Sequence, residues 1–158
     1  MLLHPSSKVF AAIRRTLPAL LVGTALLGAM PLAATEPGGV AWHHDVKTAW
    51  QSTQLQGRPL LVFVTAKNCM YCVKMKQAYS NATVAATINR SFVPLVLDGE
   101  APCPLLNDLA VKAYPATFII SPNAVILDRL DGYVTPDKLM ARLTAAQSVA
   151  TAKTAARD

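Results

Sequence analysis

The chain has 158 residues, of which 53% are hydrophobic, so it is long enough for one domain with a buried core. Its formal charge is +6 at pH 7, but Lys8, Arg14 and Arg15 lie in the N-terminal segment, and without them the charge is +3. This small charge, with no cluster of lysines and interleaved aromatic residues, gives no support for nucleic-acid binding.

The first 34 residues have the pattern of a secretory signal peptide. A basic start is followed by an apolar run over residues 17–32 and then by the small residues Ala33 and Ala34, which is the order found in secretory signals. The run contains glycines and prolines and is short for a membrane span of about 20 residues. We therefore predict a signal peptide over residues 1–34, with an uncleaved membrane anchor as the alternative. The mature protein would be periplasmic or secreted, in a compartment where disulfides persist.

The first half of the mature chain alternates between helical and extended patterns. Pro and Gly in residues 35–41 indicate a linker. Asp45 can cap a helix that Gly57 ends, and the continuous apolar run at residues 60–64 is typical of a strand buried on both faces. Pro94, in a second apolar run, predicts a bulge or a gap in strand pairing. The predicted elements are a helix over 45–56, a strand over 60–64, a helix over 69–79, a helical segment over 81–88 and a strand over 92–97.

The second half continues this alternation. Thr135 can cap a last helix with Pro136 at its first position, and the alanine-rich end beyond Ser148 predicts a frayed tail over residues 148–158. Helix-linked strands pair in parallel, whereas a short turn joins antiparallel strands. The sequence therefore predicts an α/β domain with a central mixed β-sheet flanked by helices on both faces. The remaining predicted elements are a helix over 104–113, with Leu105, Leu106 and Leu109 facing inward, and strands over 117–120 and 125–130.

A C-x-x-C motif joins the first predicted strand to the next helix. Cys69 begins that helix, where free backbone N–H groups and the helix dipole stabilise an anion and lower the pKa of a thiol. Lys67 adds a positive charge nearby, and Cys72 lies one helical turn further on, within reach of Cys69. A C-x-x-C in a βαβ unit is typical of a thiol redox site. We therefore predict Cys69 as the attacking thiolate and Cys72 as the resolving cysteine.

Two runs of sequence resemble those of the thioredoxin superfamily: PLLVFVTAKNCMYCVKMK, and AYPATFII followed by a hairpin and GY before the last helix. The likeness is strongest to small exported thioredoxin-like proteins whose domain starts with a tryptophan-bearing helix, and it covers about residues 42–143. It implies a thioredoxin-like fold over residues 42–147, with a redox-active disulfide between Cys69 and Cys72 and no separate cofactor. It also implies that Pro115, after Tyr114, is a cis-proline that faces the disulfide and positions an extended substrate.

Several positions depart from the usual thioredoxin pattern. Asn68 stands where a tryptophan usually precedes the first cysteine, and Phe63 stands where thioredoxins carry a buried acid. That acid helps to take the proton from the resolving cysteine, so its absence disfavours fast general dithiol reduction. Met70 and Tyr71 replace the usual Gly-Pro between the cysteines. This dipeptide tunes the reduction potential, and we expect both side chains to contact substrate.

These features predict an exported thiol–disulfide oxidoreductase of the protein-disulfide reductase type. We expect a monomer that acts on protein thiols and disulfides, with a membrane protein as electron donor and no nucleic-acid partner. One alternative is a copper-binding or metal-delivery module on the same fold, and another is a non-catalytic interaction domain. No metal centre is predicted, because one C-x-x-C supplies two thiolates and a closed zinc site uses four ligands. The candidate copper ligands besides the motif are Cys103, His43, His44, Met70 and Met75, although we expect Cys103 to be a spare thiol beneath a loop.

Overall fold

A computed structural model of the chain describes residues 39–155, with side chains through Ala150. The predicted signal peptide, most of the predicted linker and residues 156–158 lie outside this range. No helix within the described range is long and apolar enough to cross a membrane. Residues 39–41 of the predicted linker contact the domain: the Asn89 side chain donates to the Gly39 carbonyl and accepts from the Ala41 N–H, each at 2.9 Å.

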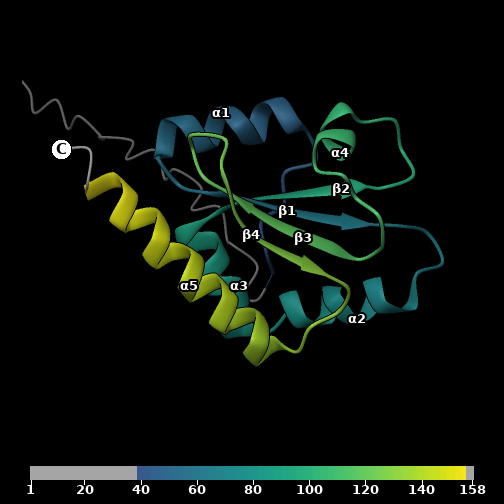
Figure 1. Cartoon of the computed structure of the whole chain (residues 1–158). Helices are drawn as coiled ribbons and strands as arrows, with labels where there is room; N and C mark the ends of the chain where they lie inside the picture. Colours follow the sequence, from purple (N-terminus) through teal and green to yellow (C-terminus); the bar gives the residue numbers. More distant parts are fainter. Residues whose placement is uncertain (1–38, 156–158) are drawn as a thin grey trace, which may run out of the picture. The chain divides into compact units, whose positions relative to one another are not determined.

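A four-stranded mixed sheet forms the centre of the domain (Figure 1). Its strand order is β2-β1-β3-β4. The pair β1–β2, which is joined through two helices, is parallel, and the pairs β1–β3 and β3–β4 are antiparallel. The predicted mixed sheet and its hairpin are therefore confirmed. The strands are β1 (Leu60–Thr65), β2 (Val93–Asp98), β3 (Ala116–Ile120) and β4 (Ile126–Asp131).

Helices cover both faces of the sheet, as the sequence predicted. Leu61 and Phe63 of β1 pack in one cluster with α2, α3 and α5, whereas Leu60, Val62 and Val64 pack in a second cluster that includes Ala49 of α1 and Leu105 of α4. This alternation explains the continuous apolar run, because both faces of β1 are buried. Burying one such side chain stabilises the fold by about 1.5–3 kcal/mol. The helices are α1 (Val46–Gln56), α2 (Met70–Tyr79), α3 (Ala82–Ser91), α4 (Pro104–Asp108) and α5 (Pro136–Ala155).

Side chains that accept backbone hydrogen bonds cap the starts of α1 and α3. Asp45 accepts from the Thr48 N–H at 2.7 Å, and Asn81 accepts from the Thr83 N–H at 3.1 Å. Such bonds satisfy N–H groups that have no partner inside the helix. Gly57 ends α1 with φ +63°, a left-handed conformation that glycine adopts without steric cost.

Three helices differ in length from the sequence prediction: α3 ends three residues later than predicted, at Ser91, and α4 and α5 differ more. The predicted helix 104–113 ends at Asp108, because Ala110 turns the backbone to φ +47°. Leu109 is nevertheless buried as expected. At the other end of the domain, α5 continues to Ala155, so residues 148–155 are helical, while the fraying predicted for residues 148–158 stays a prediction. The alanine-rich composition agrees with a helix in this segment, because alanine is the best helix former.

The prediction of a bulge or gap at Pro94 is also wrong. Pro94 pairs in regular register with Leu61 of β1. The Pro94 carbonyl accepts the His43 N–H at 2.8 Å on the side of β2 away from β1, where His43 forms a short parallel bridge with Leu95. The Pro94 nitrogen, which carries no hydrogen, therefore points toward the outer edge of the sheet, where proline is tolerated.

Candidate active site

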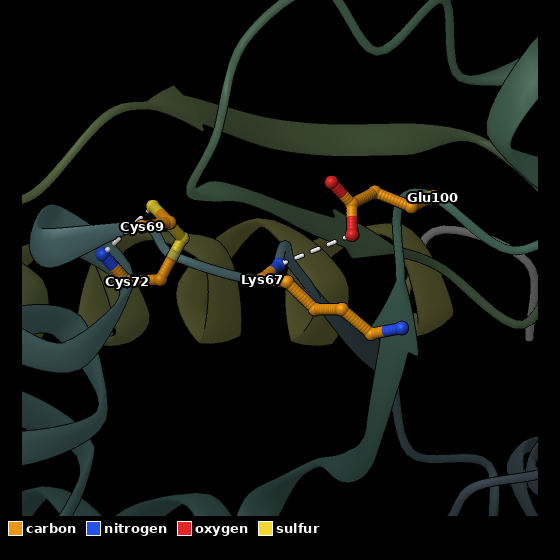
Figure 2. The surroundings of a disulfide bond; sticks show 4 residues. All are labelled: Lys67, Cys69, Cys72 and Glu100. Atoms are coloured by element: carbon orange, nitrogen blue, oxygen red, sulfur yellow. Dashed lines mark hydrogen bonds between the residues drawn. A yellow bond between two sulfur atoms is a disulfide. The ribbon is translucent and has the colours of Figure 1, made fainter.

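Cys69 and Cys72 form a disulfide at the start of α2 (Figure 2). Their Cα atoms are 5.2 Å apart. Cys69 is the N-cap residue of α2, and its Sγ accepts the Cys72 backbone N–H at 3.1 Å. Cys69 is partly exposed, whereas Cys72 is only 2% exposed. Cys69 is therefore more accessible to an approaching molecule than Cys72.

The surroundings of the Cys69 sulfur favour an anion once the disulfide is reduced. The N-terminal end of a ten-residue helix lies at Cys69, and α2 contains no Asp or Glu. The N–H that points at Sγ and the positive end of the helix dipole both stabilise a thiolate more than a thiol. Asn68, just before it, has φ +53°, a left-handed conformation that asparagine tolerates better than most residues. A tight turn thus carries the chain from β1 into α2.

The Lys67 side chain is directed away from the disulfide in Figure 2. Its ammonium is exposed, and its backbone N–H donates to a carboxylate oxygen of Glu100 at 3.4 Å. The positive charge is therefore not held against the Cys69 sulfur, and a role for Lys67 in lowering the pKa of that thiol remains a prediction. Glu100 was not predicted, although it follows the end of β2, and the ends of parallel neighbouring strands share one sheet edge.

Pro115 lies at the same end of the sheet as the disulfide. The Tyr114–Pro115 peptide bond is cis. Ala116, the next residue, pairs with Val64 near the end of β1, from which the chain continues to Cys69. The Pro115 carbonyl accepts the Gly132 N–H at 2.7 Å. The expected cis bond is therefore present, while the predicted placement of Pro115 against the disulfide and its contact with substrate remain predictions.

Tyr114 is held by an interaction that the sequence did not predict. Its hydroxyl donates to the Gly99 carbonyl at 2.7 Å, and its side chain remains 37% exposed. A Cβ added at Gly99 would lie 2.2 Å from the Tyr114 ring. Gly99 is therefore needed for this close approach. The Asp98-Gly99 turn is visible in the sequence, but its tyrosine partner is fifteen residues away.

Exposed apolar side chains surround the disulfide. Met70 is 67% exposed, and Tyr71 and Val73 are each 55% exposed. Met70 and Val73 line an open hollow of about 590 Å³ together with both cysteines and Asp98. The Lys74 ammonium lies 5.5 Å from the centre of the Tyr71 ring. Met70 and Tyr71 are therefore accessible to a partner, as their predicted role requires.

Phe63, which stands where thioredoxins usually carry a buried acid, belongs to an aromatic cluster. Phe63 is buried and lies 5.8 Å from Trp42 and 5.0 Å from Tyr79 between ring centres. The Tyr79 hydroxyl and Thr117 Oγ1 form a buried hydrogen bond of 2.7 Å, and burial raises the pKa of Tyr79. Among the described residues, no Asp, Glu or His side chain is buried. A proton leaving Cys72 must therefore pass to water or to an exposed group.

The candidate copper ligands do not form a cluster of the expected kind. Within the described part of the chain, no three His, Cys, Asp or Glu side chains come together. Met75 is fully buried in the core, and His43 lies at the outer edge of the sheet. Cys103 is a partly exposed free thiol at the start of α4. No specific contact therefore favours the metal-binding alternative.

Comparison with known proteins identifies the family. Residues 46–147 match the family described as a thioredoxin-like domain, whereas no curated protein matches the chain. Similar solved structures include a thioredoxin from Thermus thermophilus (21% identity, 67% of this chain and 85% of that chain, TM-score 0.61). DsbH oxidoreductase is also similar (17% identity, 80% and 94%, TM-score 0.59), as is the oxidised DsbD C-terminal domain of Neisseria meningitidis (18% identity, 62% and 92%, TM-score 0.52).

These matches agree with the observed architecture. The mixed four-stranded sheet, the helices on both faces and the paired cysteines after β1 are the features that the sequence predicted for a thioredoxin-like fold. A fold of this kind with a C-x-x-C pair supports thiol–disulfide exchange as its general chemistry. The chain belongs to the thioredoxin-like domain family.

Proposed function

We propose that this protein is an exported thiol–disulfide oxidoreductase that reduces disulfides in other proteins. The observation that carries the proposal is the asymmetry of the pair: Cys69 is accessible at the start of α2, and Cys72 is buried behind it. An accessible thiolate can attack a substrate, while a shielded second thiol reacts only with the first. Cys69 is thus the nucleophile and Cys72 the resolving cysteine.

The reduction proceeds in two exchange steps. The Cys69 thiolate attacks one sulfur of the substrate disulfide, the substrate S–S bond breaks, and the other substrate sulfur leaves as a thiolate that takes a proton from solvent. Cys72 then loses its proton and attacks Cys69 Sγ, which releases the second substrate thiolate and forms the Cys69–Cys72 disulfide. Two electrons pass from the protein to the substrate. A dithiol donor must return them, and we propose a membrane protein in this role.

Four further residues position the substrate in this proposal. The backbone at Tyr114 and Pro115 lies at the same sheet end as the disulfide and can align an extended segment. Met70 and Tyr71 offer exposed apolar surface to side chains on either side of the substrate cystine. Such contacts favour disulfides in flexible or unfolded protein segments, because these can extend across the site. The redox-active disulfide is the only redox group that this chemistry requires, and one copy of the chain contains the whole site.

Reduction of insulin disulfides by the purified domain tests the activity. With dithiothreitol as the donor, wild-type protein should accelerate insulin precipitation, and both Cys69→Ser and Cys72→Ser should lose turnover. Cys72→Ser should also retain its substrate as a mixed disulfide on Cys69, visible by mass spectrometry. If the wild type gives no acceleration and Cys72→Ser retains no substrate, the proposed activity is wrong.

Export is tested separately from activity. The signal pattern of residues 1–34 predicts that a full-length chain made in a bacterial host is cut near Ala34 and recovered from the periplasm. The mass of the recovered protein gives the cleavage position. An intact N-terminus on a membrane-bound product would favour the uncleaved anchor, and an intact cytoplasmic product would contradict export.

A further inference from the structure

The loop over residues 109–115 carries the proposed substrate-contacting residues and has no regular secondary structure. It connects α4 to β3, and most of its residues are exposed. Ala110 has the left-handed φ of +47°, which a residue with a side chain seldom adopts. Contacts from elsewhere in the fold must therefore fix the path of this loop.

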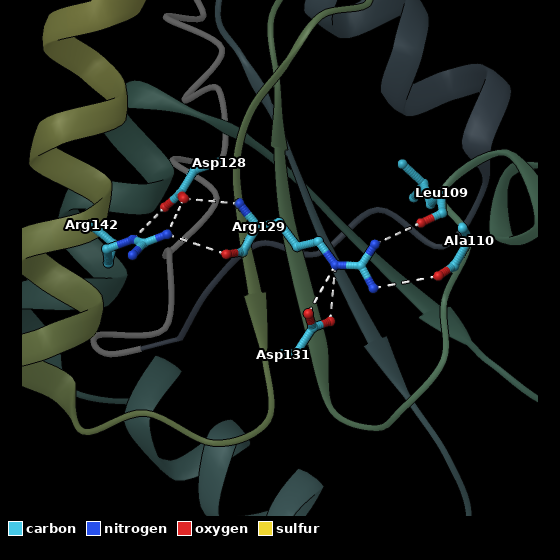
Figure 3. Close-up of polar contacts among 6 residues, drawn as sticks. All are labelled: Leu109, Ala110, Asp128, Arg129, Asp131 and Arg142. Atoms are coloured by element: carbon cyan, nitrogen blue, oxygen red, sulfur yellow. Dashed lines mark hydrogen bonds and ion pairs between the residues drawn. The ribbon is translucent and has the colours of Figure 1, made fainter.

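Arg129 of β4 binds the start of the loop (Figure 3). Its terminal nitrogens donate to the Leu109 carbonyl at 3.2 Å and to the Ala110 carbonyl at 3.4 Å. These carbonyls follow the end of α4, where no further helical turn supplies a donor. The Arg129 Nε donates to both carboxylate oxygens of Asp131 at 3.0 Å. One planar guanidinium thus joins a carboxylate on β4 to two successive loop carbonyls.

Packing fixes the orientation of this guanidinium. Its central carbon lies 5.0 Å from the centre of the Phe118 ring, and Phe118 is the cross-strand partner of Arg129 on β3. A cation held over an aromatic face gains electrostatic stabilisation. Because Phe118 is fully buried in the sheet, the Arg129 side chain rests on a rigid support. The two donors therefore point at the loop in one defined direction.

Strand β4 also fixes the far end of the loop. Gly132, directly after Asp131, donates its N–H to the Pro115 carbonyl at 2.7 Å. The Tyr114 hydroxyl adds its bond to Gly99. The segment between Ala110 and Tyr114 is thus tied at both ends, and at its start the two hydrogen bonds from Arg129 add to those that the Ala110 and Val111 N–H groups donate to carbonyls of α4.

We propose that Arg129 is a positioning residue that holds the 109–115 loop so that Tyr114 and Pro115 meet an extended substrate. This inference rests on the proposed function, because it assumes that these two residues contact a peptide. Arginine suits the role because its planar guanidinium presents several hydrogen-bond donors in fixed directions, whereas the lysine ammonium is a single point charge. Arg129 does not touch the reacting sulfurs and acts through the loop.

Arg142 of α5 provides a matched control, because it also binds β4. It forms an ion pair with Asp128 and donates to the Arg129 carbonyl at 3.2 Å, thereby joining α5 to β4 (Figure 3). Both arginines therefore bind an aspartate of β4, but the Arg142 hydrogen bonds go to β4 itself and those of Arg129 reach the loop. Replacing either with methionine removes one guanidinium and keeps an apolar side chain of similar length.

The experiment compares two substrates with Arg129→Met and Arg142→Met. One substrate is a ten-residue peptide disulfide-linked to a second peptide, and the other is the small disulfide dithiobis(nitrobenzoate). With the peptide, Arg129→Met should lower kcat/KM about 5-fold, mainly through a higher KM, while the rate with the small disulfide stays within about 2-fold. Arg142→Met should leave the ratio of the two rates unchanged. Arg129→Lys should restore part of the loss, because one donor returns.

A second readout follows the loop directly. Hydrogen exchange at the amides of residues 111–114 should be faster in Arg129→Met than in the wild type and in Arg142→Met. Equal losses on both substrates, equal effects of the two methionine variants, or unchanged exchange would each overturn the proposal. If the wild type reduces neither substrate, the proposed function fails instead, and the exchange measurement still decides whether Arg129 holds the loop.

Discussion

Two cysteines in this chain stand at the start of a helix, but their surroundings differ. Cys69 begins the ten-residue α2, its sulfur accepts a backbone N–H, and it has Cys72 as a partner. Cys103 begins the five-residue α4, its side chain makes no capping hydrogen bond, and it is a free thiol. Two cysteines at helix starts can thus have different surroundings. A directed N–H, a long helix and a second thiol in reach distinguish the first site.

The largest expected difference between the two sites is in turnover. Cys69→Ser removes the attacking sulfur, so insulin reduction should fall by at least about 100-fold. Cys103→Ser should change the same rate by less than about 2-fold, because the proposed exchange steps do not involve Cys103. The two variants are measured in parallel at equal protein concentrations. Comparable losses of the insulin reduction rate would contradict the distinction between the sites.

A smaller effect is expected at Gly99, which contacts Tyr114. The hollow beside Cys103 is lined by both Gly99 and Tyr114, and a side chain at Gly99 would overlap the Tyr114 ring. Gly99→Val should displace Tyr114 and lower kcat/KM for a peptide disulfide by about 10-fold. Tyr114→Phe keeps the ring but removes the bond to the Gly99 carbonyl, so it should lose less.

The Gly99 prediction has a clear contrary result. If Gly99→Val keeps wild-type peptide reduction while its melting temperature is unchanged, the close approach of Tyr114 has no role in substrate binding. Circular dichroism of the variant separates this outcome from a failure to fold.

The smallest expected effect concerns a third N-cap, Asp45, which is charged at neutral pH. Hydrogen bonds from the side chain and the backbone N–H of Thr48 lower the pKa of Asp45. A carboxyl whose pKa is lower in the folded state stabilises the fold above its unfolded pKa, and this contribution is lost as the pH falls through the folded value. Asp45→Asn keeps a good N-cap but cannot ionise. The difference in Tm between wild type and Asp45→Asn should therefore favour the wild type at pH 7 and shrink below about pH 4.

Asp108→Asn serves as the control for Asp45, because Asp108 is exposed at the last position of α4 and caps no helix start. Its Tm difference from the wild type should vary less between pH 7 and pH 3. A pH-independent difference for Asp45→Asn would show that the charge of the cap makes no contribution.

Local patterns in the sequence were sufficient for the sheet, for most helices and for the redox pair. The apolar run of β1, the cap at Asp45 and the spacing of Cys69 and Cys72 depend on neighbouring residues, and their structural consequences follow from strand and helix periodicity. The cis-proline position at Pro115 came from family resemblance, since sequence alone does not specify a cis bond.

The missed features all depend on contacts between distant parts of the chain. Arg129 donates hydrogen bonds to the carbonyls of residues about twenty positions earlier in the chain, and no periodic pattern in the sequence predicts these contacts. The same contacts lie just after the end of α4 at Asp108. Periodicity alone had predicted that this helix continues to residue 113. The prediction at Pro94 was wrong because His43, whose N–H binds the Pro94 carbonyl at the outer edge of the sheet, lies far earlier in the chain. Lys67 illustrates a further limit: proximity in sequence did not direct its ammonium toward the neighbouring sulfur.

The central claim is that the start of α2 makes Cys69 an ionised and accessible nucleophile. Alkylation by iodoacetamide of the reduced chain, followed residue by residue by mass spectrometry between pH 5 and pH 9, tests it most directly, with Cys103 as the internal reference. The account predicts that Cys69 reacts about 10-fold faster than Cys103 at pH 7 and that its rate levels off at a lower pH. Equal rates with the same pH dependence for the two thiols would contradict it.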